Sequence, residues 1–149
     1  MKRIITTLFA AVLLYAGKSS ASDLVPVTLM QSFFETFTNA QDVKWEKRSG
    51  YNIASFTREN IKQSAVYSEA GQLIAVARQI NEKEISQKLK ADLTERFEGY
   101  FATTIFEMKD DTGISYFATV TNGKKELILK AGRSKWFSLK EKNLSEASE

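Results

Sequence analysis

The apolar positions change period twice along the first half of the chain. Met30, Phe33, Phe34 and Phe37 recur at spacings of three and four residues, so they share one face of an amphipathic helix. From residue 43 the apolar positions alternate with polar ones, which is typical of a strand with one buried face. This first half therefore predicts one helix followed by four strands, at residues 43–47, 51–57, 61–68 and 73–80, with hairpin turns at 58–60 and 69–71.

The same order of patterns begins again near residue 85. Ile85, Leu89, Leu93 and Phe97 lie four residues apart, as expected of a second amphipathic helix. Strands are predicted after it at residues 100–108, 114–121, 126–131 and 135–139. Leu29, Phe33 and Phe37 fall on Leu89, Leu93 and Phe97 at an offset of 60. We therefore predict a tandem repeat, residues 26–80 and 82–142, with chance agreement of short apolar patterns as the alternative.

Two helices are too few to cover both faces of eight strands. The predicted fold class is therefore α+β, with the helices on one face of an antiparallel sheet and the other face partly open. Small residues predict where a helix lies close to the sheet, and Ala54, Ala65 and Ala118 are the candidates. Trp45, Phe56 and Tyr67 are expected to fill the space between helix and sheet.

The open face is the predicted site of function. Tyr and Phe are enriched at the centres of protein interfaces, so Tyr51 and Phe117 are the preferred contact residues. A register slip of one residue would exchange the two faces, which leaves the opposite assignment open. The residues predicted to point away from the helices, and to bind a partner, are Tyr51, Ile53, Lys62, Val66, Arg78, Phe106 and Phe117.

The N-terminus has the three-part layout of a secretory signal peptide. A short cationic start is followed by an apolar run over residues 4–17 and by small polar residues, which predicts cleavage after Ala21. A membrane anchor is the rival interpretation, but the run has only fourteen residues, whereas a span needs about 20. We expect a periplasmic or secreted product with no membrane anchor after cleavage. Its parts are a folded domain, residues 22–142, and a polar tail, residues 143–149.

Cleavage changes the charge balance. The full sequence has 21 lysine and arginine residues against 18 acidic ones, but three of the cations lie within residues 1–21. The mature net charge is therefore zero, and the basic character of the full chain indicates no nucleic-acid partner. The segment from Lys124 to Lys142 still contains seven cationic residues and only two glutamates. We interpret these charges as side chains on solvated strand faces and in a polar tail.

The residue types available limit the chemistry. The sequence has no cysteine and no histidine, which excludes disulfides, thiolate nucleophiles, imidazole bases and Cys/His metal sites. Asp110–Gly113 could suggest a calcium loop, but the alternating ligands and the final glutamate are missing, so a hairpin turn is predicted there. We predict no cofactor, no metal and no enzymatic activity. An enzyme that works through paired carboxylates stays open, because only their spatial separation would reveal it.

Three runs of the first half, residues 37–47, 50–56 and 65–73, carry a family resemblance. Their shared elements are Asn39-Ala40 at the helix end, the Val43-Lys44-Trp45-Glu46 strand, and Ala65-Val66-Tyr67 before a glycine turn. The chain resembles the PepSY-like, beta-lactamase-inhibitor-like family of small exported proteins found mainly in Bacteroidetes. The second half matches mainly in element order and has Thr103 and Ile105 in place of Val43 and Trp45.

The resemblance implies tandem helix-plus-four-strand units that form a curved sheet, and proteins that grip an enzyme with the open side of that sheet. It implies no catalytic residues. We therefore predict an exported, non-enzymatic binding module, an inhibitor or regulator of a hydrolase or peptidase, with another protein as its partner. The alternative is a periplasmic carrier of a small apolar or amphiphilic ligand, enclosed between sheet and helices.

Overall fold

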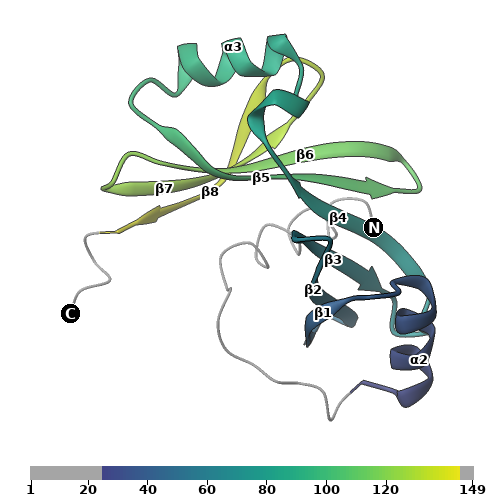
Figure 1. The fold of residues 1–149 in the computed structure, drawn as a ribbon. Helices are drawn as coiled ribbons and strands as arrows, with labels where there is room; N and C mark the ends of the chain where they lie inside the picture. The colour runs from purple at the N-terminus through teal and green to yellow at the C-terminus, as the bar shows by residue number, and fades with distance from the viewer. Residues whose placement is uncertain (1–24, 145–149) are drawn as a thin grey trace. The chain divides into compact units, whose positions relative to one another are not determined.

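A computed structural model describes residues 25–144 of the chain. The predicted signal peptide, and residues 145–149 of the predicted tail, lie outside this range. The described residues form an open sheet of eight antiparallel strands in sequential order with two α-helices (Figure 1). In chain order the elements are α2 (Val27–Thr36), β1 (Gln41–Arg48), β2 (Tyr51–Arg58), β3 (Ile61–Tyr67), β4 (Leu73–Ile80), the short 3-10 helix η2 (Glu82–Glu84), α3 (Gln87–Arg96), β5 (Phe101–Asp110), β6 (Gly113–Thr121), β7 (Lys125–Ala131) and β8 (Trp136–Asn143).

The packing divides these residues into two units. The N-terminal unit contains residues 25–78 together with 108–113. The C-terminal unit contains residues 79–107 together with 114–144. Each unit has one α-helix packed against strands, and each has its own core. The order of one helix and four strands recurs, while descent of the two halves from one ancestral repeat stays a prediction.

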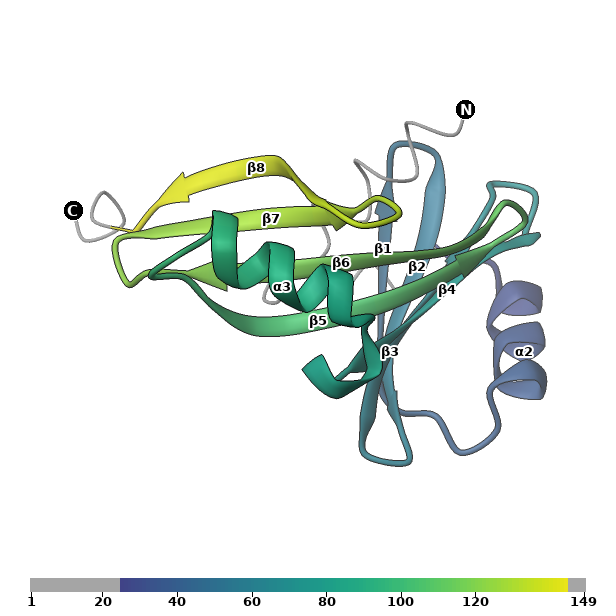
Figure 2. The same ribbon diagram turned by 90° about the horizontal axis from the view of Figure 1, so that it is seen from above.

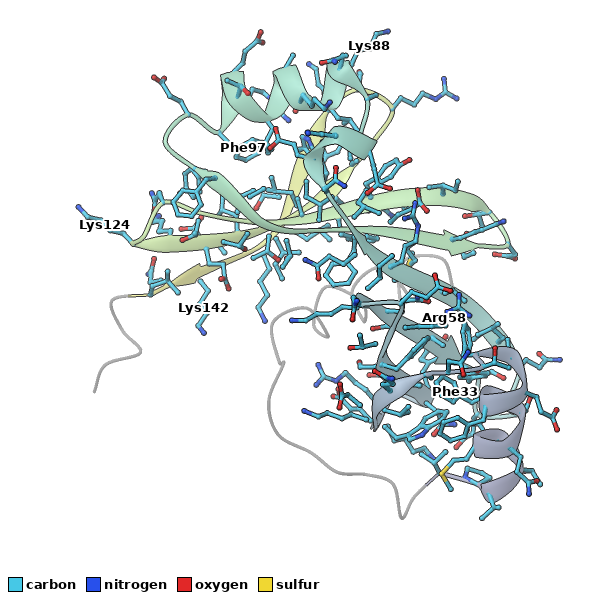
Figure 3. The ribbon with its side chains drawn as sticks, viewed as in Figure 1. Phe33, Arg58, Lys88, Phe97, Lys124 and Lys142 are labelled. Carbon is cyan, nitrogen blue, oxygen red and sulfur yellow. The ribbon has the colours of Figure 1, made fainter. Side chains whose placement is uncertain are left out.

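In the N-terminal unit, α2 places an aromatic core against the sheet (Figure 3). Phe33 is fully buried, and its ring makes edge-on contacts with Trp45 at 5.3 Å and with Phe56 at 5.0 Å between ring centroids. Ala54 and Ala65 are cross-strand partners in the same core, and their small side chains leave room for these rings. The predicted helix-facing side of this unit is therefore confirmed.

In the C-terminal unit, α3 lies over the strands and buries mainly aliphatic side chains (Figure 2). Leu89 and Leu93 of the helix share a core with Ala118 and Trp136 of the strands, which confirms the prediction for Ala118. The helix begins later than its apolar spacing predicts, because the Ser86 hydroxyl accepts a hydrogen bond from the Leu89 N–H and caps it. Ile85 precedes the cap in extended backbone and still joins the core.

Tight turns join the strands and set their register. Between β1 and β2, Ser49 and Gly50 both have positive φ, 51° and 81°, as a two-residue type I′ hairpin requires. Between β5 and β6, the Asp110 carboxylate accepts hydrogen bonds from the Thr112 N–H at 2.7 Å and hydroxyl at 2.6 Å. The segment 110–113 is therefore the hairpin turn that the sequence predicts.

The last strand is longer than predicted. Its apolar pattern ends at Leu139, but β8 continues to Asn143, paired residue by residue with β7. The predicted polar tail, residues 143–149, therefore overlaps the strand at Asn143. The alternation is hidden because Lys140 and Lys142 stand where apolar residues would mark a strand, and a charged side chain is tolerated on a strand at the end of a sheet.

Candidate partner-binding surface

The strand register places six of the seven predicted contact residues on the side away from the helices. Ile53 and Val66 are cross-strand partners beside the helix-facing pair of alanines, so they point to the opposite face. Tyr51 lies two residues from Ile53 in β2, and Lys62 lies four residues from Val66 in β3, so both point to this face as well. Phe117 lies next to Ala118 and pairs with Lys130, and Phe106 follows Ile105 of the α3 core.

Arg78 is the exception, and its predicted direction is wrong. Ala65, which faces α2, pairs with Val76, and Gln63 pairs with Arg78 two residues further along. Since residues two apart share a face of a strand, Arg78 lies on the α2 side of the sheet. The pairing of β3 with β4 contains a register irregularity at Val66–Tyr67, which a simple count of alternating positions does not anticipate.

Exposure differs from prediction at four further positions. Ile53 and Val66 are each 1% exposed, Phe117 is 0% exposed and Phe106 is 8% exposed. In β3, the five residues from Gln63 to Tyr67 are all buried, so this strand is covered on both faces. Period-two alternation predicts the side that a residue takes but not whether that side meets solvent, and apolar surface is stabilised by leaving water.

Tyr51 and Lys62 retain access to solvent. Tyr51 is half-buried at the start of β2 and pairs with Arg48, whose guanidinium forms an ion pair with Glu46. Lys62 is exposed and pairs with Thr57 at the other end of β2. The two predicted contacts therefore lie at opposite ends of the strands, and their role in binding stays a prediction.

A second exposed region, not predicted from the sequence, begins at a clamp on the first residue of β8. The fully buried Trp136 donates its indole N–H to the Leu89 carbonyl at 3.0 Å and its backbone N–H to the Asp92 carboxylate at 2.8 Å. Arg96 donates to the Trp136 carbonyl and holds Asp92 through two further bonds, of 2.7 and 2.8 Å. Helix α3 thus fixes where β8 starts.

The Arg96 hydrogen bonds also set the ionisation of this clamp. They lower the pKa of Asp92 below its ordinary value, against the smaller opposing effect of burial. The same contact raises the pKa of Arg96. The carboxylate therefore stays ionised and the guanidinium stays protonated, so the clamp is closed at neutral pH.

The residue after the clamp is held outward by a close approach of the preceding turn. Phe137 is 57% exposed, and its ring lies against Gly132, where an added Cβ would be only 2.8 Å from the Phe137 Cε2 atom. The Gly132 N–H closes the turn by donating to the Lys135 carbonyl at 2.8 Å. The glycine therefore leaves the space that the Phe137 ring occupies.

Beyond Phe137 the strand presents exposed residues only. Leu139 is 42% exposed and occupies the register irregularity between β7 and β8. Phe137 pairs with Lys130, Lys140 with Ile128, and Lys142 with Glu126, so these three β8 residues share the side away from α3. We call Phe137, Leu139, Lys140 and Lys142 the β8 surface.

The charges of the β8 surface are incompletely balanced. On the α3 side, Glu141 accepts a hydrogen bond from Lys125, which raises the pKa of that lysine. Within residues 25–144, neither Lys140 nor Lys142 forms an ion pair. Figure 3 shows Lys142 extending from the side of the strands away from α3, near the end of the β7–β8 hairpin that also carries Lys124. The region therefore combines exposed apolar side chains with available positive charge.

Other kinds of site have less support in the described part of the chain. Residues 25–144 contain no group of three or more acidic side chains placed to hold a metal ion. A shallow depression along α2 is lined by Val27, Met30 and Phe34 together with two polar residues. It is open to solvent, so an apolar ligand there would keep much of its surface in water, and the carrier function stays a prediction.

None of the described helices is long and apolar enough to cross a membrane. The predicted export segment lies outside the described residues.

The sequence contained one signal for the β8 surface. The cationic surplus between Lys124 and Lys142 marks the β7–β8 hairpin, but taken alone it predicts only solvated strand faces and a polar tail. The sequence predicts that Phe137 and Leu139 lie in a strand, but it does not predict their exposure. Their exposure follows from the position of β8 at the end of the sheet order, which a pattern of single residues does not reveal.

Comparison with known proteins is informative at the level of structure. No protein-family model and no curated protein sequence matches the chain. A protein from Bacteroides eggerthii, provisionally described as periplasmic, superimposes with a TM-score of 0.68 at 10% identity over 83% of this chain and 92% of that one. A DUF2874 family protein from Bacteroides uniformis gives a TM-score of 0.66 at 10% identity, covering 81% of this chain and 91% of that chain.

A BLIP-like protein from Bacteroides fragilis is also similar, with a TM-score of 0.58 at 15% identity, covering 80% of this chain and 87% of that chain. The chain has the BLIP-like fold. This likeness agrees with the beta-lactamase-inhibitor-like part of the resemblance seen in the sequence. Identities this low show the fold alone, and the PepSY-like part of the resemblance stays a prediction.

Proposed function

We propose that the mature chain is an exported, non-enzymatic binding module that contacts another protein and restrains it, the partner being a hydrolase or a peptidase. The observation that carries the proposal is the β8 surface, where Phe137 and Leu139 are exposed beside Lys140 and Lys142, two lysines that form no ion pair within residues 25–144. A binding site of this kind has an apolar anchor with polar and charged residues around it.

Rigidity supports a binding role for these side chains. Trp136 is bonded to α3, and Phe137 rests against the turn at Gly132, so the anchor is largely ordered before a partner arrives. Ordering an interface side chain costs about 0.5–1.5 kcal/mol, and a preformed anchor avoids part of that cost. An exposed phenylalanine that is also held in place is therefore more consistent with binding than with a solvated surface.

The fold and the N-terminus support the remaining parts of the proposal. BLIP-like structural neighbours favour protein binding as the use of this sheet. The predicted signal peptide, together with the provisionally periplasmic neighbour, supports a periplasmic or secreted location. Tyr51 and Lys62 are retained as candidate contacts of the N-terminal unit. Ile53, Val66, Phe106 and Phe117 are too buried to contact a partner without rearrangement.

The proposal is tested by quantitative affinity capture from an extract of the source cell envelope, followed by calorimetry with each purified captured protein. The test variant is the double substitution Phe137→Asp and Leu139→Asp. The matched control is Ile114→Asp, since Ile114 is also 57% exposed and belongs to the same unit. We expect the double variant to lose a partner that the control keeps, and the partner's hydrolase or peptidase activity to fall as wild-type protein is added.

Equal binding by the double variant and the wild type would refute the role of the β8 surface. A captured partner whose activity does not change would refute restraint while leaving a binding function. Lipid found by native mass spectrometry in protein purified from its source, with no stoichiometric protein, would favour the carrier alternative.

A further inference from the structure

We propose that β8 receives an extended, acidic segment of the partner as an added antiparallel strand. This inference rests on the proposed function and names the mode of binding and the kind of segment bound. It starts from the position of β8, which is the last strand in the sheet order, so that within residues 25–144 no strand pairs with its outer edge.

The backbone direction along β8 identifies the groups available at that edge. The Leu144 N–H donates to the Lys124 carbonyl at 2.8 Å, so residue 144 directs its backbone groups toward β7. Alternation along a strand then directs Lys140 and Lys142 toward β7 as well, and directs Glu141 and Asn143 outward. The N–H and carbonyl groups of Glu141 and Asn143 are therefore placed to pair with a new strand.

The side chains select against a second copy of this chain as the occupant. If two β8 strands paired antiparallel about Glu141, Lys140 of one copy would lie opposite Lys142 of the other, and like charges directly opposite are destabilising. Lysines on an outer strand are a common means of preventing self-pairing. The same two lysines would favour a segment that places acidic residues opposite them.

The charge of the whole hairpin supports an acidic segment. From Lys124 to Lys142 there are seven cationic residues against two glutamates, and one of these, Glu141, already accepts from Lys125. Phe137 shares the face of Lys140 and Lys142, so an apolar residue further along the same segment would meet its ring. The expected occupant is an extended stretch with acidic residues at alternate positions, next to an apolar one.

The geometry gives a test in which the protein is not altered. The probe is a short fluorescent peptide of alternating glutamate and valine, and its binding to the purified protein is followed by anisotropy. With glutamates opposite Lys140 and Lys142, it is the valine N–H groups that point to β8. N-methylation of the valines should therefore abolish binding, whereas N-methylation of the glutamates should leave it unchanged. Equal effects of the two modifications, or no binding by the unmodified peptide, would overturn the inference.

Protein variants test the same edge from the other side. Glu141→Pro removes one outward N–H, a substitution that an outer strand tolerates, and Glu141→Ala removes the same carboxylate but keeps the N–H. We expect the proline variant to bind the peptide about tenfold more weakly than the alanine variant, the effect of one lost hydrogen bond. Thermal unfolding of both variants verifies that they are folded. Equal affinities in two folded variants would contradict strand addition.

Charge reversal separates this inference from the proposed function. Lys140→Glu with Lys142→Glu should lose the glutamate–valine peptide and gain a lysine–valine peptide. If the partner protein is captured through Phe137 and Leu139 but neither the peptide nor the Glu141→Pro variant behaves as expected, strand addition is wrong and the binding function stands. If no captured protein depends on Phe137 and Leu139, the proposed binding function of the β8 surface is wrong, whatever the peptide results are.

Discussion

Replacing Asp92 by asparagine should destabilise the C-terminal unit, because this carboxylate joins α3 to the first residue of β8. The side chain is 10% exposed and accepts from Arg96 at 2.7 and 2.8 Å and from the Trp136 N–H at 2.8 Å. An asparagine of the same size has only one acceptor oxygen. If that oxygen takes the Oδ2 position and accepts from the Arg96 Nη2–H and the Trp136 N–H, the side-chain NH2 takes the Oδ1 position and faces the Arg96 Nε–H, so that charge-assisted hydrogen bond is lost.

The magnitude follows from the kind of hydrogen bond that is lost. Bonds to charged groups contribute about 1.5–3 kcal/mol each, and the partial exposure of Arg96 reduces its share. We expect Asp92→Asn to lower the free energy of unfolding by about 2 kcal/mol at pH 7. For a domain of this size, about 4 °C per kcal/mol predicts a fall in Tm of about 8 °C.

The pH dependence has a defined sign. The pKa of Asp92 is lowered from its ordinary value of 3.8, so the ionised carboxylate stabilises the folded state. That stabilisation is complete above the pKa of the unfolded chain and is lost as the pH falls through the folded pKa. The difference in stability between wild type and Asp92→Asn should therefore shrink as the pH falls below 3.8.

Tryptophan fluorescence provides the assay. The chain has two tryptophans, so a Trp45→Phe background leaves the fully buried Trp136 as the reporter of the C-terminal unit. Glu95→Gln is the matched control, because it removes the same charge from an exposed position of the same helix. A Tm for Asp92→Asn no lower than that of the control, or a stability difference that persists unchanged in acid, would refute the reasoning.

Three further predictions concern the N-terminal unit and can be measured by chemical denaturation and spectroscopic titration. Burial raises the pKa of Tyr67 to about 12, and its buried hydroxyl has no hydrogen-bond partner among residues 25–144, so Tyr67→Phe should be neutral or stabilising by about 1 kcal/mol. Above the ordinary tyrosine pKa of 10.0, the phenol of the unfolded wild-type chain ionises before that of the folded chain, so the wild type loses stability as the pH rises. Tyr67→Phe should lack this loss, and an equal fall in the free energy of unfolding of both proteins above pH 10.0 would contradict the prediction. Phe33→Ala should cost about 3–5 kcal/mol, because it opens a cavity among three aromatic rings, and a loss below about 1 kcal/mol would mean that this core is not packed as described. Ser49→Asn should add about 0.5 kcal/mol, since it supplies the Asn-Gly pair that a type I′ turn favours, and destabilisation would place the turn in another class.

The order of elements could be read from the sequence because each element carries its own local signal. The four-residue spacing of Leu89, Leu93 and Phe97 predicts α3, and alternation predicts most strands within a few residues. Ala54, Ala65 and Ala118 also predicted correctly which side of the sheet the helices cover, since only small side chains allow a helix to approach closely. These features depend on neighbours that are near in sequence.

Only the tertiary structure decided which surfaces meet solvent. Alternation placed Phe117 and Ile53 on the side away from the helices, but burial of that side depends on packing between residues far apart in the chain. Likewise, Phe137 is exposed because β8 ends the sheet and because Gly132 leaves space for its ring. The local pattern of residues determines the face of the sheet to which a side chain points. Whether that face meets solvent, and which strand lies at the edge of the sheet, is decided only when segments distant in the sequence pack together.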